Sequence, residues 1–104
     1  MKLEEVWEVL RRLESRDYSE ARLGTKEKPF IIEGNFNRID LSKASGWVTI
    51  KGFVNILDAS NAQDLHLELV GKFNFVDLSG AKVELNRKKA EINIFDASGA
   101  SGKW

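Results

Sequence analysis

The chain has 104 residues, which is the usual length of a single domain. Its 16 basic and 16 acidic residues balance, so no long-range field would attract nucleic acid or an anionic membrane surface. The absence of cysteine excludes disulfides, thiolate zinc sites and cysteine nucleophiles. We therefore expect no nucleic-acid partner and no membrane insertion, and the high content of Glu, Lys and Arg is typical of a thermophile.

The first segment, from Lys2 to about Glu14, has the spacing of an amphipathic helix. Its apolar face comprises residues three and four apart: Leu3, Val6, Trp7 and Leu10. Glutamates interrupt the apolar positions, so the segment is neither a secretory signal nor a membrane span, and we expect a cytoplasmic protein. We predict that this helix either caps one end of the domain that follows or mediates assembly.

Residues 15–29 are polar and contain Gly24 and the only proline, Pro29. This composition indicates a connector, in which Ser19 to Leu23 could form one short helical turn. We therefore divide the chain into a helix and connector at 1–29 and a repetitive domain at 30–104.

An eight-residue frame recurs four times, with the rule Asn, any, apolar, Asp, Leu or Ala, Ser, any, Ala. The copies span residues 37–44, 55–62, 74–81 and 93–100, and their first residues are 18, 19 and 19 apart. A fixed period of this size indicates units that stack on their neighbours. Strand-like segments with alternating apolar residues lie between the frames, as in LHLEL at 65–69. The sequence thus predicts a mainly β fold, a short parallel β-helix (solenoid) of about three and a half coils.

Stacking the frames converts sequence positions into columns. Two apolar columns should fill the core: Ile39, Leu57, Val76 and Phe95, and, two residues further on, Leu41, Ala59, Leu78 and Ala97. The asparagines have the same parity, so alternation places them inward, where a ladder of amides would satisfy each one. These residues are Asn37, Asn55, Asn74 and Asn93.

The aspartate column should face outward beside the serines two residues on. Its members are Asp40, Asp58, Asp77 and Asp96. Like charges at coil spacing repel by about 1 kcal/mol even in water, so something must offset the repulsion. We expect each Asp to accept hydrogen bonds from the adjacent Ser and from backbone amides. A row of cations bound by these oxygens is the alternative, although the glycine-rich calcium-binding nonapeptide is absent.

One column has no evident structural role. It consists of Arg38, Ile56, Phe75 and Ile94, which face away from the core by parity although three of them are large and apolar. Three explanations are open: the N-terminal helix covers the column, another subunit contacts it, or a corner within the frame turns it inward. Trp104 occupies the column of Val48 and Leu85, where it would either close the last coil or meet another subunit.

The sequence contains no catalytic constellation. His66 is the only histidine and is expected on the surface, and no glycine-rich phosphate loop is present. We expect no enzyme activity, no cofactor and no metal.

The segments FNRIDLSKASGWVTIKG, FNFVDLSGAKVEL and INIFDASGAS resemble the adhesin-type head GIN domains, a family of short parallel β-helices. They also resemble, less closely, the self-polymerising bactofilins. The resemblance covers residues 34–101 and implies a right-handed solenoid without catalytic residues.

We predict a non-enzymatic structural or interaction module that associates with itself or with another protein through an exposed apolar surface of the solenoid or of the helix. A module that binds carbohydrate or a cell surface is the alternative, and Trp47 and Trp104 are its only aromatic candidates.

Overall fold

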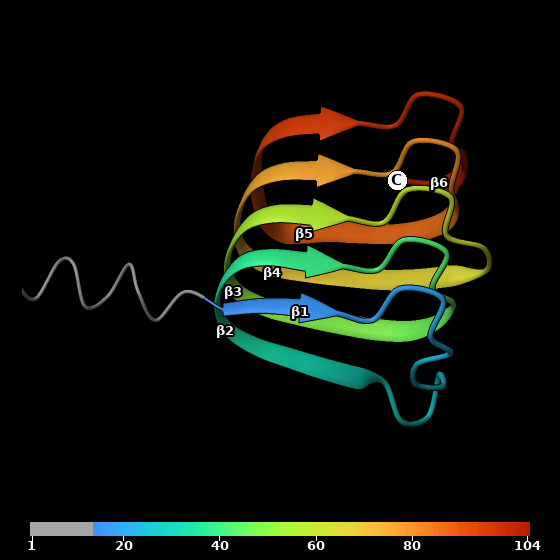
Figure 1. Cartoon of the computed structure of the whole chain (residues 1–104), viewed down its shortest axis with the longest axis horizontal. Coiled ribbons are helices and arrows are strands. Elements are labelled where there is room, and N and C mark those ends of the chain that lie inside the picture. Colours follow the sequence, from blue (N-terminus) through green and yellow to red (C-terminus); the bar gives the residue numbers. More distant parts are fainter. Residues whose placement is uncertain (1–13) are drawn as a thin grey trace, which may run out of the picture.

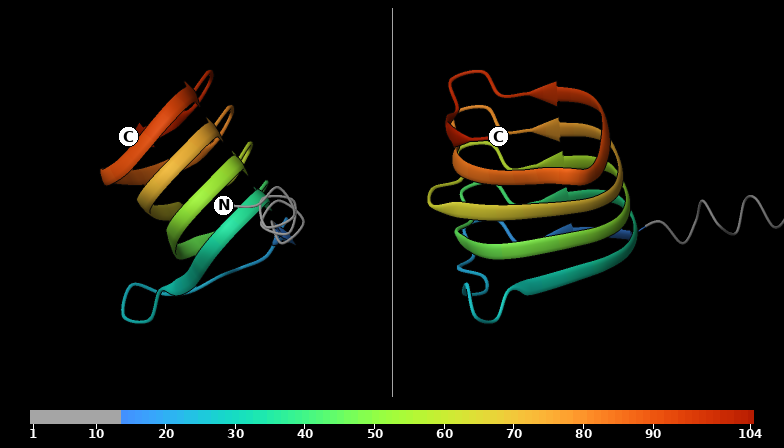
Figure 2. Two further views of the ribbon diagram at one scale, coloured as in Figure 1. Left: turned by 90° about the vertical axis from the view of Figure 1, so that its left-hand side faces the viewer. Right: turned by 180° about the vertical axis from the view of Figure 1, so that it is seen from behind.

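The computed structural model describes residues 14–104 of the chain. Its regular secondary structure consists of β1 (Glu14–Asp17), β2 (Phe30–Asp40), β3 (Gly46–Asp58), β4 (Leu65–Asp77), β5 (Lys82–Asp96) and β6 (Ser101–Lys103). The six strands form one parallel sheet in sequence order, and this sheet winds into a solenoid of about five turns (Figures 1 and 2). The predicted β-solenoid is confirmed, and the described residues contain no helix.

Each long strand joins two segments that the sequence suggested were separate. In β3, for example, the segment at 47–50 and the first four residues of the next frame belong to one strand of 13 residues. We call the part from the frame Asn to the Asp the frame half, which ends in the arrowheads of Figure 1, and the part before it the back half. The two halves meet at a bend, so the sheet folds over on itself and encloses the core.

Glycines just before the bend allow the coils to stack closely. Gly34, Gly52 and Gly71 lie opposite one another in register and have φ angles of 143°, 132° and 117°. A Cβ atom on Gly71 would lie 2.1 Å from the carbonyl oxygen of Gly52, so no other residue fits there. Ala90 holds this position in β5, where one extra residue between Asn86 and Lys89 forms a bulge that shifts the register.

The second half of each frame forms a corner with a left-handed residue. At the seventh frame position, Lys43 has a φ of 58°, Asn61 of 59° and Gly80 of 68°. The Ala that follows is buried in the first three frames, and its N–H donates to the carbonyl oxygen of the residue three before it. The frame is therefore half of a strand and one tight corner.

The solenoid begins earlier than predicted. β1 pairs with β2, with Asp17 opposite Asp40, and the N–H of Tyr18 donates to the carbonyl oxygen of Asp40 at 2.8 Å. Ser19 to Leu23 form a corner and not a helical turn, because Arg22 makes a parallel β-bridge with Ser45. The connector thus contains a further partial coil, which explains why the structure has about five turns.

The predicted helix lies outside the described residues, apart from Glu14, which belongs to β1. This applies to Leu3, Val6, Trp7 and Leu10. Within residues 14–104 no helix is long and apolar enough to span a bilayer.

The core fills the space between the frame halves and the back halves. Phe73, Ile39, Leu57 and Leu78 are among its fully buried side chains. The predicted core columns point inward, and burial decreases at Phe95 and other residues of the coil that contains β5. Burial of such side chains contributes about 1.5–3 kcal/mol each, so the columns are the main source of stability.

We expect Gly71→Ala to destabilise the fold far more than Gly34→Ala. Both substitutions place a side chain at a positive φ, which costs about 1–3 kcal/mol. Only at position 71 does the new Cβ also collide with backbone, whereas at position 34 its nearest neighbour is the Phe36 ring at 3.4 Å. Urea denaturation followed by circular dichroism measures both losses. Equal losses would show that close stacking of the coils does not require the glycine.

Candidate functional site

The column with no evident role lies on the outer surface of the frame halves. Arg38, Ile56, Phe75 and Ile94 lie opposite one another in register. Ile56 is 41% exposed and Ile94 58% exposed, while Phe75 is half-buried. The inward-corner explanation is therefore wrong for this column. We call Ile56, Phe75 and Ile94 the apolar stripe.

The bend of each coil explains why the stripe faces out. Phe36 and Ile39 are both buried, so the two residues between them, Asn37 and Arg38, both lie on the outside of the turn. The prediction that the asparagines point inward is wrong for the same reason. Simple alternation does not continue through a bend.

The asparagines nevertheless form a ladder at the surface. The Nδ2 atom of Asn55 donates to Oδ1 of Asn37 at 3.3 Å, that of Asn74 to Asn55 at 2.8 Å, and that of Asn93 to Asn74 at 2.7 Å. Each amide thus satisfies its neighbour in the next coil, and the column has a structural role.

The aspartates bond to the serines two residues on. Oδ1 of Asp58 accepts a hydrogen bond from the Ser60 amide at 3.0 Å and one from the Ser60 hydroxyl at 2.7 Å. Asp40, Asp77 and Asp96 repeat both bonds. These bonds stabilise the charged carboxylate against repulsion along the column.

The pKa values of two column members follow from these contacts. Burial raises the pKa of Asp58, but the hydrogen bonds from Ser60 and Arg38 outweigh burial and leave the pKa below its ordinary value. The Ser98 hydroxyl and amide lower the pKa of Asp96. In addition, Arg38 lies 3.0 Å from Asp58 and 3.7 Å from Asp40, so one cation offsets part of the negative charge.

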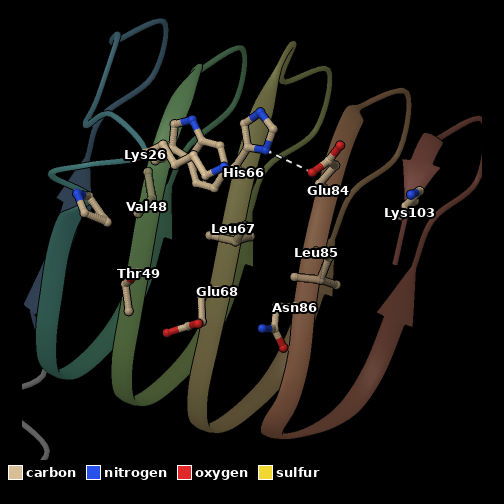
Figure 3. A pocket seen from close by; sticks show the side chains of 12 residues that line it. Lys26, Val48, Thr49, His66, Leu67, Glu68, Glu84, Leu85, Asn86 and Lys103 are labelled. Atoms are coloured by element: carbon tan, nitrogen blue, oxygen red, sulfur yellow. Dashed lines mark hydrogen bonds and ion pairs between the residues drawn. The ribbon is translucent and has the colours of Figure 1, made fainter.

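A groove of about 420 Å³ crosses the back halves of β3, β4 and β5. Trp47, His66, Glu84 and Lys103 lie opposite one another in register and line the groove. Figure 3 shows His66 and Glu84 along one side of the groove, and Glu68 and Asn86 along the other. The rings of Trp47 and His66 stack with their centroids 3.9 Å apart. His66 is half-buried on the groove surface, and its Nδ1 atom lies 3.1 Å from Oε2 of Glu84.

The two tryptophans differ as candidate aromatic platforms. Trp47 is half-buried and His66 covers one face of its ring. Trp104 is 41% exposed and follows Lys103 in the column of Leu85. Only Trp104 therefore offers a large exposed aromatic surface among the residues that the structure describes.

No group of three or more His, Asp or Glu side chains within residues 14–104 is arranged to hold a metal ion. The Ser and Asp side chains bond to one another within each coil, and His66 lies on the other half of the coil from both columns. Among the described residues the side chain within hydrogen-bonding distance of His66 is that of Glu84, so none of the repeated serines pairs with the histidine.

Sequence reasoning missed one copy of the frame and the whole groove. Asp17, Ser19, Glu20 and Ala21 match the last positions of the frame, and Asp17 accepts a hydrogen bond from the Ser19 amide at 2.9 Å. This Asp, Ser, Ala spacing was a usable signal. The groove had no comparable signal, because its residues differ from coil to coil.

The chain matches no protein-family model, and neither the curated proteins nor the solved structures contain a match to it. The resemblance to head GIN domains and bactofilins therefore stays a prediction.

We expect Ser60→Ala to raise the pKa of Asp58, because the variant lacks the hydroxyl that donates to the carboxylate. A lowered pKa stabilises the fold above the ordinary value of 3.8, and this contribution is lost as the pH falls through the folded-state pKa. The variant should therefore lose about 1 kcal/mol of unfolding free energy at neutral pH and less in acid.

NMR titration of the Asp58 carboxyl carbon, with urea denaturation at several pH values, tests this expectation. Ser101→Ala is the control, since the Ser101 hydroxyl makes no hydrogen bond within the described residues. An unchanged Asp58 titration would show that Ser60 does not hold the carboxylate.

Proposed function

We propose that this protein is a non-enzymatic structural module that self-associates through the apolar stripe. The observation that carries the proposal is the outward, in-register placement of Ile56, Phe75 and Ile94. The other frame columns pack in the core, form the amide ladder or make the Asp and Ser pairs, and the seventh position forms the left-handed corner. The stripe has no such partner among residues 14–104 and presents large apolar side chains to solvent.

The flanking columns favour a protein partner. Each asparagine on one side and each aspartate on the other already makes a hydrogen bond within its own chain, so covering the stripe leaves fewer polar groups that need a new partner. Three side chains are a small contact, because a standard interface buries about 800 Å² on each partner. We therefore expect weak association, with a dissociation constant roughly in the micromolar to millimolar range.

Sedimentation equilibrium over a wide concentration range tests the proposal. The average mass of the wild type should rise with concentration, whereas Phe75→Asp should remain monomeric because it would bury a charge in the contact. The circular dichroism spectrum of the variant should match that of the wild type, since Phe75 faces outward.

Ile31→Asp is a matched control, since Ile31 is 55% exposed on the back half, away from the stripe. This variant should associate as the wild type does. A wild type that stays monomeric at every concentration would refute the proposal.

Carbohydrate binding is the second candidate function, and the groove is the observation that favours it. Its volume of about 420 Å³ is that of a small-ligand site, and Glu68 and Asn86 provide hydrogen-bonding groups opposite Trp47. Titration calorimetry with soluble oligosaccharides should show saturable binding that Trp47→Ala abolishes. No change with any sugar, or equal binding by the variant, would eliminate this candidate.

A further inference from the structure

The outer surface of the frame halves has two chemically different sides. The amide ladder lies on one side of the apolar stripe and the aspartate column on the other. The first side is neutral and carries N–H donors, and the second is negative and carries oxygen acceptors. Two copies that pack through their stripes must therefore also match these sides.

The hydrogen-bonding capacity of the two sides is complementary. An asparagine amide has two N–H donors, and Asn74 uses one of them on Asn55. Each aspartate uses Oδ1 to accept from its own serine. Within residues 14–104 no hydrogen bond or ion pair reaches Oδ2 of Asp77 or Asp96. The asparagine side thus still has N–H groups that can donate, and the aspartate side still has carboxylate oxygens that can accept.

Two simple twofold arrangements bring the stripes face to face. If the twofold axis runs along the strands, the solenoid axes are antiparallel and every column meets its own copy. Asp77 then faces the partner's Asp77, and Asp96 faces the partner's Asp58. Such pairs of carboxylates repel by about 1 kcal/mol or more each, and contact removes the water that screens them.

If the twofold axis runs along the solenoid, the solenoid axes are parallel and the strands are antiparallel. Each coil then meets the same coil of the partner, so Phe75 packs on the partner's Phe75. The asparagine column precedes the stripe by one residue and the aspartate column follows it by two. A twofold axis midway between these two columns therefore places the asparagines over the partner's aspartates, with the two Phe75 side chains side by side, and allows charge-assisted hydrogen bonds. The two Arg38 side chains approach each other at one end, but each is already paired with its own Asp58 at 3.0 Å.

Building on the proposed function, we propose that the partner is a second copy of this chain in this parallel, twofold arrangement. The apolar stripe supplies the contact, and the amide and carboxylate columns determine its orientation. The dimer is closed by symmetry, because a twofold contact uses the same surface on both copies.

A charge placed on the asparagine side distinguishes the arrangements. In the parallel arrangement Asn93 lies opposite the partner's Asp96, so Asn93→Lys creates two symmetric ion pairs. Exposed ion pairs contribute about 0.2–1 kcal/mol each, so the dissociation constant should fall by roughly fivefold, and high salt should remove the gain. Asn93 is exposed at the end of the ladder and accepts no amide from another described coil, so the substitution removes only the bond that Asn93 donates to Asn74, and circular dichroism should show an unchanged fold.

Asn35→Lys is the matched control, because it adds the same charge at an exposed position outside the frame half. It should leave the dissociation constant unchanged. Asp96→Asn should not tighten the dimer, since in the parallel arrangement Asp96 faces an amide and not a carboxylate.

Sedimentation equilibrium of the wild type and the three variants is the experiment. Tightening by Asn93→Lys alone supports the parallel dimer. Tightening by Asp96→Asn with no effect of Asn93→Lys overturns it in favour of antiparallel solenoids, although self-association stands. If the wild type associates and none of the variants, including Phe75→Asp, changes the dissociation constant, the contact lies elsewhere and the parallel dimer is also overturned. A monomeric wild type refutes the proposed function itself.

Discussion

The structure depends on one constraint: successive coils must follow nearly the same path so that their backbones can hydrogen-bond in parallel register. The carbonyl oxygen of Gly52 would lie 2.1 Å from a Cβ atom on Gly71, so β4 cannot stack this closely on β3 at the bend with any other residue at position 71. The left-handed corner residues, such as Asn61, meet the same requirement at the other end of the frame half. The frame recurs in the sequence because each coil follows the same path and therefore requires the same residue types at the same positions.

Stacking also makes neighbours of the residues that hold the same position in successive coils. Each residue type must therefore pack or bond with the equivalent residue of the next coil. Apolar side chains in the core satisfy this requirement by packing. Asparagine satisfies it with a ladder of amides, as between Asn74 and Asn55, and aspartate by bonding to a serine within its own coil. Ile56, Phe75 and Ile94 can pack against one another, but no contact within the described fold requires large apolar side chains at these outer positions. This is the reason to assign them a role between molecules.

The repeat predicted the fold class, the core columns and the bonds between Asp and Ser, because these depend on period and local chemistry alone. The orientation of Asn37 was not predictable, since parity applies only to a straight strand and the coil bends between Phe36 and Ile39. The first partial coil was not predicted, because the loop from Gly24 to Pro29 makes the spacing between Asp17 and Asp40 longer than the period of the later frames. The groove could not be predicted from the sequence for another reason. Trp47, His66 and Glu84 lie in one column, but they have different chemical types and so form no repeated pattern.

We propose that the apolar stripe is the surface on which two copies meet. Amide chemical shifts, followed by NMR while the protein is diluted, test this claim residue by residue without any substitution. The shifts that depend on concentration should cluster at Ile56, Phe75 and Ile94 and in the adjoining asparagine and aspartate columns. Shifts confined to the groove around Trp47 and His66, or no dependence on concentration, would contradict it.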